Sequence, residues 1–211
     1  MDRNPLIKIF WLFIIGSLLG CVYETILTLV RTGQFQRRVS LLYGPFSTIY
    51  GFGAVTLFIV FALFKNRPNV FAVFAYGAVV CTIVEFFFAW VQQKAFGTHS
   101  WDYSNQPLNI QGRVCLYSFL AWGGLAIIWV WLVEPLFEKL LHLIPNGAAV
   151  PLTAALFTLL MLDAGITLAA MLRWADRLKG LPAGNAFAAW LDKAYPNGYM
   201  ELIFPSLKFV N

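Results

Sequence analysis

Five long apolar runs are the feature of this sequence that most limits its fold. They cover residues 9–30, 46–64, 70–91, 114–133 and 150–172. A helix needs roughly 20 residues to cross about 30 Å of hydrocarbon, and each run has about that length. Backbone groups in a membrane must pair within the protein, and the runs lack the alternating pattern of barrel strands. The sequence therefore predicts an all-α integral membrane protein with about five transmembrane helices.

The composition excludes the main soluble alternatives. The 211 residues are 60% hydrophobic and 12% charged, whereas about 25% of a typical soluble domain is charged. A soluble fold of this size cannot bury so much apolar surface. The net charge of +5 comes from residues scattered between the runs, which is not the basic patch of a nucleic-acid-binding protein. The first run continues past Cys21 and is too long for a signal-peptide core, so we expect no cleavage there.

Basic residues near the ends of the runs predict the orientation. Eight lie on the face that carries loops 31–45 and 92–113, and they are Arg31, Arg37, Arg38, Lys94, Arg113, Arg173, Arg177 and Lys179. Five lie on the other face, and they are Arg3, Lys8, Lys65, Arg67 and Lys139. The positive-inside rule then places the C-terminus in the cytoplasm and the N-terminus outside.

Two units follow from this layout. Residues 1–172 are predicted to form the helical bundle, and residues 173–211 a cytoplasmic or interfacial tail. Stretch 134–149 is expected to lie at the membrane interface. In the tail, Asn185 is a candidate N-cap for a short helix whose apolar residues Phe187, Trp190 and Leu191 are expected to rest on the bilayer.

The first and third runs share a spacing that suggests an internal repeat. A glycine precedes a glutamate by eight residues in both, namely Gly16 and Glu24 in the first and Gly77 and Glu85 in the third. Each of the two runs is followed by a polar loop and an uncharged run, in which we align Tyr50 with Tyr117. The two hairpins, 9–64 and 70–133, are then tandem copies with the same orientation. The alternative is chance similarity between glycine-rich helices, and the sequence does not decide between the two.

Two glutamates inside spans are the strongest candidates for a functional site, because an ionisable group in a membrane is energetically costly. Glu24 and Glu85 lie on the same half of the membrane, each about 9 Å from the end of its run. The nearby loops carry arginines and hydrogen-bonding side chains that converge on the same face. The predicted substrate-binding residues are Glu24, Glu85, Arg113, Asp102, Asn105, Trp101, Arg38 and Tyr50. A purely structural glutamate–arginine network is the alternative, since buried ion pairs also fix helix packing.

Other candidate sites are weaker. Asp163 lies near the middle of the fifth run, where it either binds a proton or cation or, as we favour, hydrogen-bonds a neighbouring helix. His99 and His142 are predicted on opposite faces, so no metal site is expected. The sequence has no P-loop motif and no Gly-x-Ser-x-Gly nucleophile elbow, and it predicts no cofactor. An enzyme is therefore not the favoured interpretation, although it stays open.

Several short motifs resemble those of a known bacterial family. They are residues 23–25 (Tyr-Glu-Thr), 42–46 (Leu-Tyr-Gly-Pro-Phe), 49–53 (Ile-Tyr-Gly-Phe-Gly), 101–104 (Trp-Asp-Tyr-Ser) and 112–113 (Gly-Arg). Together they resemble the putative ABC-transporter type IV permease family over roughly residues 9–133, with the fifth run and the tail outside the match. The resemblance implies a multi-pass protein of the bacterial inner membrane that works with a separate ATPase subunit.

The function predicted from these observations is that of a membrane permease subunit or small-molecule-binding membrane protein. Its partners are the lipid bilayer, a separate ATPase subunit and further copies of the same chain. One alternative is a membrane-embedded enzyme that acts on a lipid or isoprenoid headgroup through the carboxylates and arginines. A second alternative is a scaffold or regulatory protein without transport activity.

Overall fold

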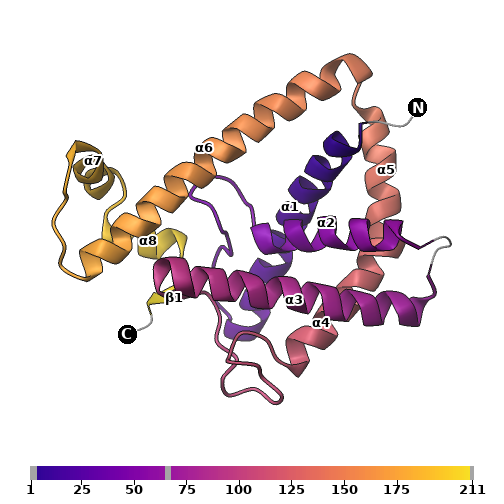
Figure 1. Cartoon of the computed structure of the whole chain (residues 1–211), viewed down its shortest axis with the longest axis horizontal. Helices are drawn as coiled ribbons and strands as arrows, with labels where there is room; N and C mark the ends of the chain where they lie inside the picture. Colours follow the sequence, from indigo (N-terminus) through magenta and orange to yellow (C-terminus); the bar gives the residue numbers. More distant parts are fainter. Residues whose placement is uncertain (1–3, 65–67, 210–211) are drawn as a thin grey trace.

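The computed structural model describes residues 4–64 and 68–209 and is 72% helical, which confirms the all-α prediction (Figure 1). Arg3 and most of the predicted 65–69 turn lie outside the described residues. The helices are α1 (Pro5–Thr32), α2 (Thr48–Ala62), α3 (Val70–Phe96), α4 (Leu116–Ile128), the π-helical η1 (Trp129–Val133), α5 (Glu134–Leu143), α6 (Asn146–Leu178), α7 (Ala186–Ala194) and α8 (Asn197–Ile203). The two-residue strands β1 (Thr98–His99) and β2 (Lys208–Phe209) pair antiparallel, with Thr98 opposite Phe209.

Among the described residues, four helices are long and apolar enough to cross a membrane, which makes the predicted count of five approximate. They are α1, α3, the continuous helix Leu116–Leu143 and α6 from Gly147 onward. The second apolar run, 46–64, forms only the 15-residue α2, about 22 Å long at 1.5 Å per residue. Its first residues belong to a turn, because the Ser40 N–H donates to the Phe46 carbonyl at 2.7 Å and the Thr48 N–H to Ser40 Oγ at 3.1 Å.

The fourth span is longer than predicted. Stretch 134–149 was expected at the interface, but its first part is α5, which continues α4 through η1. The helix Leu116–Leu143 as a whole has the length and composition of a membrane span. Pro135 lacks an N–H, and the preceding turn instead forms a wider bond in which the Glu134 N–H donates to the Trp129 carbonyl. Such a π-turn carries a helix past a local break in its bonding pattern.

The first helices of the two predicted hairpins begin and end with the same local chemistry. Asn4 and Asn69 cap α1 and α3 with side chains that accept backbone N–H groups. Both helices end at a glycine with a left-handed backbone, Gly33 at φ 69° and Gly97 at φ 64°. A glycine adopts that conformation without a side-chain clash, so both helices stop where their loops begin.

The packing inside the hairpins is also matched, with α1 against α2 and α3 against α4. A Cβ atom on any of four glycines would overlap a residue of the facing helix, so each helix pair approaches closely. The contacts correspond between hairpins at the same spacing, Gly16–Ala54 with Gly77–Ala126 and Phe13–Gly51 with Phe74–Gly123. These matched contacts support the tandem repeat.

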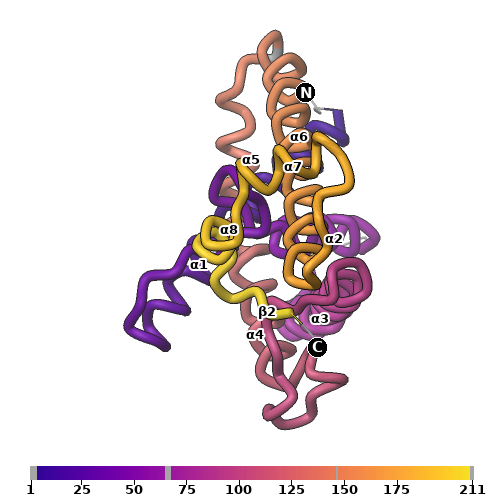
Figure 2. Tube along the Cα trace, turned by 90° about the vertical axis from the view of Figure 1, so that its left-hand side faces the viewer, coloured from indigo at the N-terminus to yellow at the C-terminus, as the bar shows by residue number. Residues whose placement is uncertain are grey.

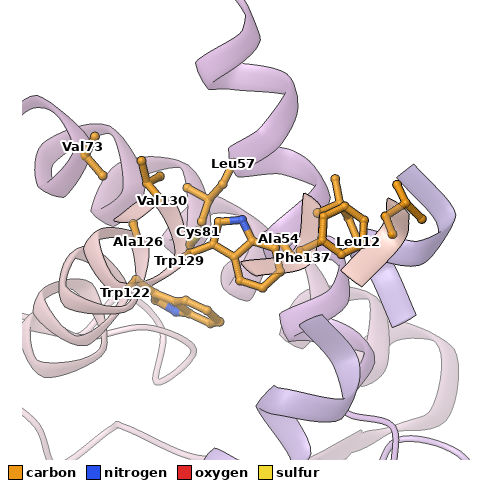
Figure 3. Close-up of a cluster of buried hydrophobic side chains, with 11 residues drawn as sticks. Leu12, Ala54, Leu57, Val73, Cys81, Trp122, Ala126, Trp129, Val130 and Phe137 are labelled. Atoms are coloured by element: carbon orange, nitrogen blue, oxygen red, sulfur yellow. The ribbon is translucent and has the colours of Figure 1, made fainter. Parts of the chain in front are cut away.

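The core lies between the hairpins and α5 (Figure 3). Buried side chains from α1 to α5 meet there, and they include Leu12, Ala54, Leu57, Val73, Cys81, Trp122, Trp129 and Phe137. Lys8 of α1 forms an ion pair with Glu138 of α5, which joins the two helices at the end away from the long loops. The core therefore ties both hairpins and the extended fourth span into one unit.

Helix α6 runs across the bundle and carries α7 and α8 at its far end (Figures 1 and 2). Trp11 of α1 donates from its Nε1 to Thr153 Oγ1 at 2.9 Å. Helix α7 has the predicted cap, since the Ala188 N–H donates to Asn185 Oδ1 at 2.8 Å. Phe187 and Trp190 are exposed and stacked, but Leu191 is buried in a second cluster, so its predicted position on the bilayer is wrong.

Candidate functional site

A cavity of about 280 Å³ lies where α1, α2 and α3 meet the loops and the C-terminal tail. Glu24 and Arg38 line it, together with aromatic residues that include Tyr50 and Trp101. Its other polar groups are hydroxyl and amide side chains, namely Ser40, Ser47, Thr48, Gln92, Ser100 and Ser206. Ser206 of the tail reaches the cavity because β2 pairs with β1, the strand that directly follows α3.

Glu24 is held from two sides. Tyr50 of α2 donates its hydroxyl to Oε1, and Arg38 of the following loop donates from Nε to Oε2 at 3.4 Å. The two charged side chains are 25% and 19% exposed, so the ion pair is largely shielded from solvent. The Arg38 backbone N–H also bonds Thr25 Oγ1 at 3.4 Å, which brings the loop back onto α1. The Glu24–Arg38 ion pair is thus held in place as part of the cavity wall.

Glu85 has neutral partners. Trp122 of α4 donates from Nε1 to its Oε2 at 3.0 Å, and the Tyr103 hydroxyl donates to its Oε1 at 3.4 Å. The side chain is only 5% exposed. Burial and the nearby Glu85 carboxylate raise the pKa of Tyr103 far above its ordinary range. Tyr103 therefore remains a phenol at physiological pH and keeps its proton to donate.

The two glutamates are related through an aromatic pair. The rings of Tyr50 and Trp122 lie 5.0 Å apart, and each donates to the glutamate of its own hairpin. The glycine contacts that match between the hairpins place Tyr50 opposite Trp122. The predicted alignment of Tyr50 with Tyr117 is therefore wrong. The contacts between helices set which residues correspond, and the loops before α2 and α4 differ in length.

Arg113 does not pair with either glutamate through any contact in the described structure. Its guanidinium donates to Gln93 and Gln111 and lies 5.3 Å from the centre of the Phe86 ring. Because the two glutamines bind this guanidinium, the predicted grouping of Arg113 with Glu24 and Glu85 is not seen. Arg38 is the arginine that makes the expected contact.

The 101–113 loop divides the remaining candidates. Trp101 lines the cavity, and its Nε1 donates to the Arg113 carbonyl at 2.8 Å. Asp102 and Asn105 are exposed in this loop, which projects from the bundle between α3 and α4 (Figure 1). Asp102 accepts the Ser104 N–H and hydroxyl, which lower the pKa of its carboxyl. Neither Asp102 nor Asn105 lines the cavity, so their predicted grouping with Glu24 is not seen.

A second cavity of about 260 Å³ lies between the hairpins, inside the spans. Its walls are almost wholly apolar and include Leu57, Leu125 and the first and last residues of the π-helical segment, Trp129 and Val133. Tyr50 lines this cavity as well as the polar one. One tyrosine therefore stands between a polar and an apolar space.

Asp163 lies outside the candidate site and stabilises a loop. The Tyr43 N–H donates to its Oδ1 at 3.2 Å, and Thr167 donates to the same oxygen at 3.1 Å. Thr167 in turn accepts the Leu42 N–H at 3.0 Å. Asp163 thus fastens the 39–47 loop to α6, where the sequence suggested a neighbouring helix. Within residues 4–64 and 68–209, no group of three His, Cys, Asp or Glu side chains is placed to hold a metal ion.

Sequence reasoning missed three contributors to the site. Trp122 and Tyr103 bind Glu85, and Ser206 brings the tail to the cavity. A stricter repeat alignment would have found Trp122, because it stands in the second hairpin where Tyr50 stands in the first. The role of the tail had no local signal, since it depends on the pairing of two-residue strands far apart in the chain.

This geometry defines a multi-pass α-helical membrane protein with a polar cavity at one end of its bundle. The chain belongs to the family described as putative ABC-transporter type IV, which matches residues 11–168. The match includes most of α6 and so extends well beyond the region of resemblance expected from the sequence motifs, 9–133. No curated protein and no solved structure matches the chain.

Proposed function

We propose that this protein is a permease-like membrane subunit that binds a small molecule or polar group in the cavity beside Glu24 and Arg38. The observation that carries the proposal is the Glu24–Arg38 ion pair on the wall of a cavity rich in hydroxyl groups. Arg38 uses Nε for Glu24, and the described residues give its two terminal nitrogens no hydrogen bond. An arginine that keeps two donors available is well suited to bind an anionic group.

Membership of the family supports a transport role with a separate ATPase subunit. In that arrangement the ATPase supplies the energy, and this chain contributes the path or the binding site. The cytoplasmic face is then expected to be the face that carries the loops and the tail, because the basic residues favour it. We propose the bacterial inner membrane as its location, which membership of the family supports.

The test compares purified wild-type protein with Arg38→Gln and the matched control Arg37→Gln, since Arg37 is exposed in the same loop. Mass spectrometry of bound lipids and small molecules is expected to find a species that Arg38→Gln loses and Arg37→Gln keeps. Proteomics of the same samples is expected to find an ABC-type ATPase, and intact mass gives the number of chain copies. Equal small-molecule content in all three samples would contradict the binding site, and absence of an ATPase would contradict the permease.

A membrane-embedded enzyme that acts on a lipid or isoprenoid headgroup is the second candidate. It is favoured by the hydrogen bond between Tyr50 and Glu24 at the cavity wall, because a carboxylate beside a phenol provides a path for proton transfer. The enzyme predicts turnover of a headgroup in purified protein that Glu24→Gln and Glu85→Gln abolish and Arg37→Gln does not. Absence of any turnover by wild-type protein would contradict the enzyme, and the permease subunit would be the remaining proposal.

A further inference from the structure

We propose that the two cavities on either side of Tyr50 form one binding site for a membrane amphiphile with a phosphate-bearing headgroup. The headgroup occupies the cavity at Glu24 and Arg38, and a hydrocarbon chain occupies the apolar cavity between the hairpins. This inference rests on the proposed function and specifies its ligand class.

The sizes of the two cavities favour a shared ligand. Their volumes are about 280 Å³ and 260 Å³. Ligand sites usually enclose roughly 300–1,000 Å³, so each cavity alone is small and the two together fall inside that range. Tyr50 is a wall of both. A ligand that spans both sides of this residue uses space that neither cavity provides separately.

The polar cavity has the chemistry for a phosphate-bearing headgroup. The two terminal nitrogens of Arg38 are without hydrogen bonds from residues 4–64 and 68–209, and an arginine binds phosphate with two parallel donors. Glu24 lies beside it and can accept a hydroxyl or ammonium group of the same headgroup. The surrounding hydroxyls of Ser47 and Ser206 add neutral donors. One cation and one anion side by side thus fit a headgroup that carries both an acidic oxygen and a donor.

The second cavity has the chemistry for a hydrocarbon chain. Its walls include Leu19, Leu57, Leu125 and Ile128, all within helices of the bundle. Such walls offer water almost no hydrogen bonds, so hydrocarbon is the more favourable occupant. The π-turn at Trp129–Val133 borders it, and π-turns inside helices are frequent at functional sites.

Tyr50 suits the boundary between headgroup and chain. Its hydroxyl bonds Glu24 on the polar side, and its ring packs against Gly20 and Trp122 on the apolar side. A tyrosine has an apolar body and a polar tip, which is the character of the junction in an amphiphile. A helix of a partner chain is a less suitable occupant, because the glycines Gly16 and Gly20 are already covered by Ala54 and Tyr50.

The experiment blocks each half of the site separately. Gly53 lines the apolar cavity, and a Cβ there meets Trp122 at 3.7 Å and Cys81 at 3.8 Å, which are ordinary contacts. Gly53→Leu therefore fills the cavity, and Gly53→Ala is the milder version in case leucine disturbs folding. Gly124→Leu is the matched control, since a Cβ at Gly124 meets nothing within 4 Å. Arg38→Gln and its control Arg37→Gln test the headgroup side.

Each purified variant is placed in nanodiscs of phosphatidylethanolamine and phosphatidylglycerol that contain a phospholipid with a photoreactive diazirine near the end of its chain. In wild-type protein the crosslinks are expected within residues 125–133. Gly53→Leu and Gly53→Ala are expected to reduce them, and Arg38→Gln to reduce them about tenfold, the loss expected for a charged hydrogen bond. The two control variants are expected to match wild type.

Three results would overturn the proposal. One is crosslinking spread over the outer surface of α6 with no enrichment within residues 125–133. Another is unchanged crosslinking in both Gly53 variants. The third concerns a reagent that modifies arginine. If inorganic phosphate protects Arg38 from this reagent as strongly as the lipid does, the site binds a polar solute, and the proposed function is preserved. If Arg38→Gln changes neither lipid nor phosphate binding, the proposed function fails as well.

Discussion

Tyr50 and Trp122 stand at corresponding positions of two helical hairpins, with their rings 5.0 Å apart. Each donates a hydrogen bond to a glutamate on the first helix of its own hairpin. The two glutamates differ in their other partner, because Glu24 has an arginine and Glu85 has the phenol of Tyr103. The repeat therefore produces two similar carboxylate positions with different charge balance, and this difference leads to the first two predictions.

Arg38→Gln is expected to lower thermal stability by roughly 1–3 kcal/mol, because it leaves a half-buried Glu24 without its cation. Glu24→Gln removes the charge at the same place, and the double variant is expected to recover part of the Arg38→Gln loss. Thermal unfolding in detergent, followed by tryptophan fluorescence, measures the cycle. Glu85 and Arg113 share no contact, so the same cycle on that pair is expected to be additive. Additivity at Glu24 and Arg38 would contradict the coupling.

Trp122→Phe is expected to be more destabilising than Tyr103→Phe, since the indole donates to Glu85 at 3.0 Å and the phenol at 3.4 Å. Removal of a donor from a buried carboxylate costs roughly 1–3 kcal/mol. The unfolding midpoint of each variant in the same detergent is the measurement. Tyr117→Phe is a suitable control because Tyr117 is 45% exposed. A larger effect at Tyr103 would show that the phenol is the main partner.

Gly77→Val is expected to separate α3 from α4, because even a Cβ there overlaps Ala126. Overpacking of this kind usually costs about 1–3 kcal/mol. The yield of folded protein, measured as the monodisperse peak in size-exclusion chromatography, is expected to fall relative to wild type. Gly124→Val is the matched control on the facing helix, where the added atoms have open space. Equal behaviour of the two variants would contradict the close helix contact.

The tail is expected to loosen in acid. Asp192 of α7 accepts hydrogen bonds from Arg173 and Arg177, and these lower the pKa of its carboxyl. A carboxyl with a lowered pKa stabilises the folded state at neutral pH, and that contribution disappears as the pH falls through the folded-state pKa. The protection of α7 amides from hydrogen exchange, relative to the intrinsic rate at each pH, is therefore expected to be high at neutral pH and lower below the usual range for aspartate. Asp192→Asn is expected to have low protection at both pH values, and high protection in that variant would contradict the ion pairs.

Reporter fusions test the orientation that the basic residues predict. A fusion after residue 180 is expected to report the cytoplasm, and an insertion within 65–69 the opposite side, by the eight-to-five distribution of basic residues. A cytoplasmic signal from 65–69 would reverse the assignment. The opposite orientation would leave the cavity unchanged and move its loops to the outer face.

The helices were predictable because long apolar runs have few alternatives in a membrane, and four of the five runs lie within long spans. Glu24 and Arg38 were predictable as partners because both lie close to the same loop. The grouping of Arg113 with the glutamates was wrong because its partners, Gln93 and Gln111, are neutral residues that no sequence pattern marks as partners. The shortness of α2 depends on hydrogen bonds between Ser40, Phe46 and Thr48 that only the folded loop creates.

The strand pairing between β1 and β2 sets an order of events during synthesis. Phe204, Ser206 and Leu207 form one wall of the polar cavity, and the ribosome makes them after the four long spans that the structure describes. The spans can enter the bilayer while that wall does not yet exist, and the cavity remains incomplete until β2 reaches β1. Insertion into the membrane and assembly of the site are thus separate steps, and truncation before residue 204 would yield an inserted protein with an open site.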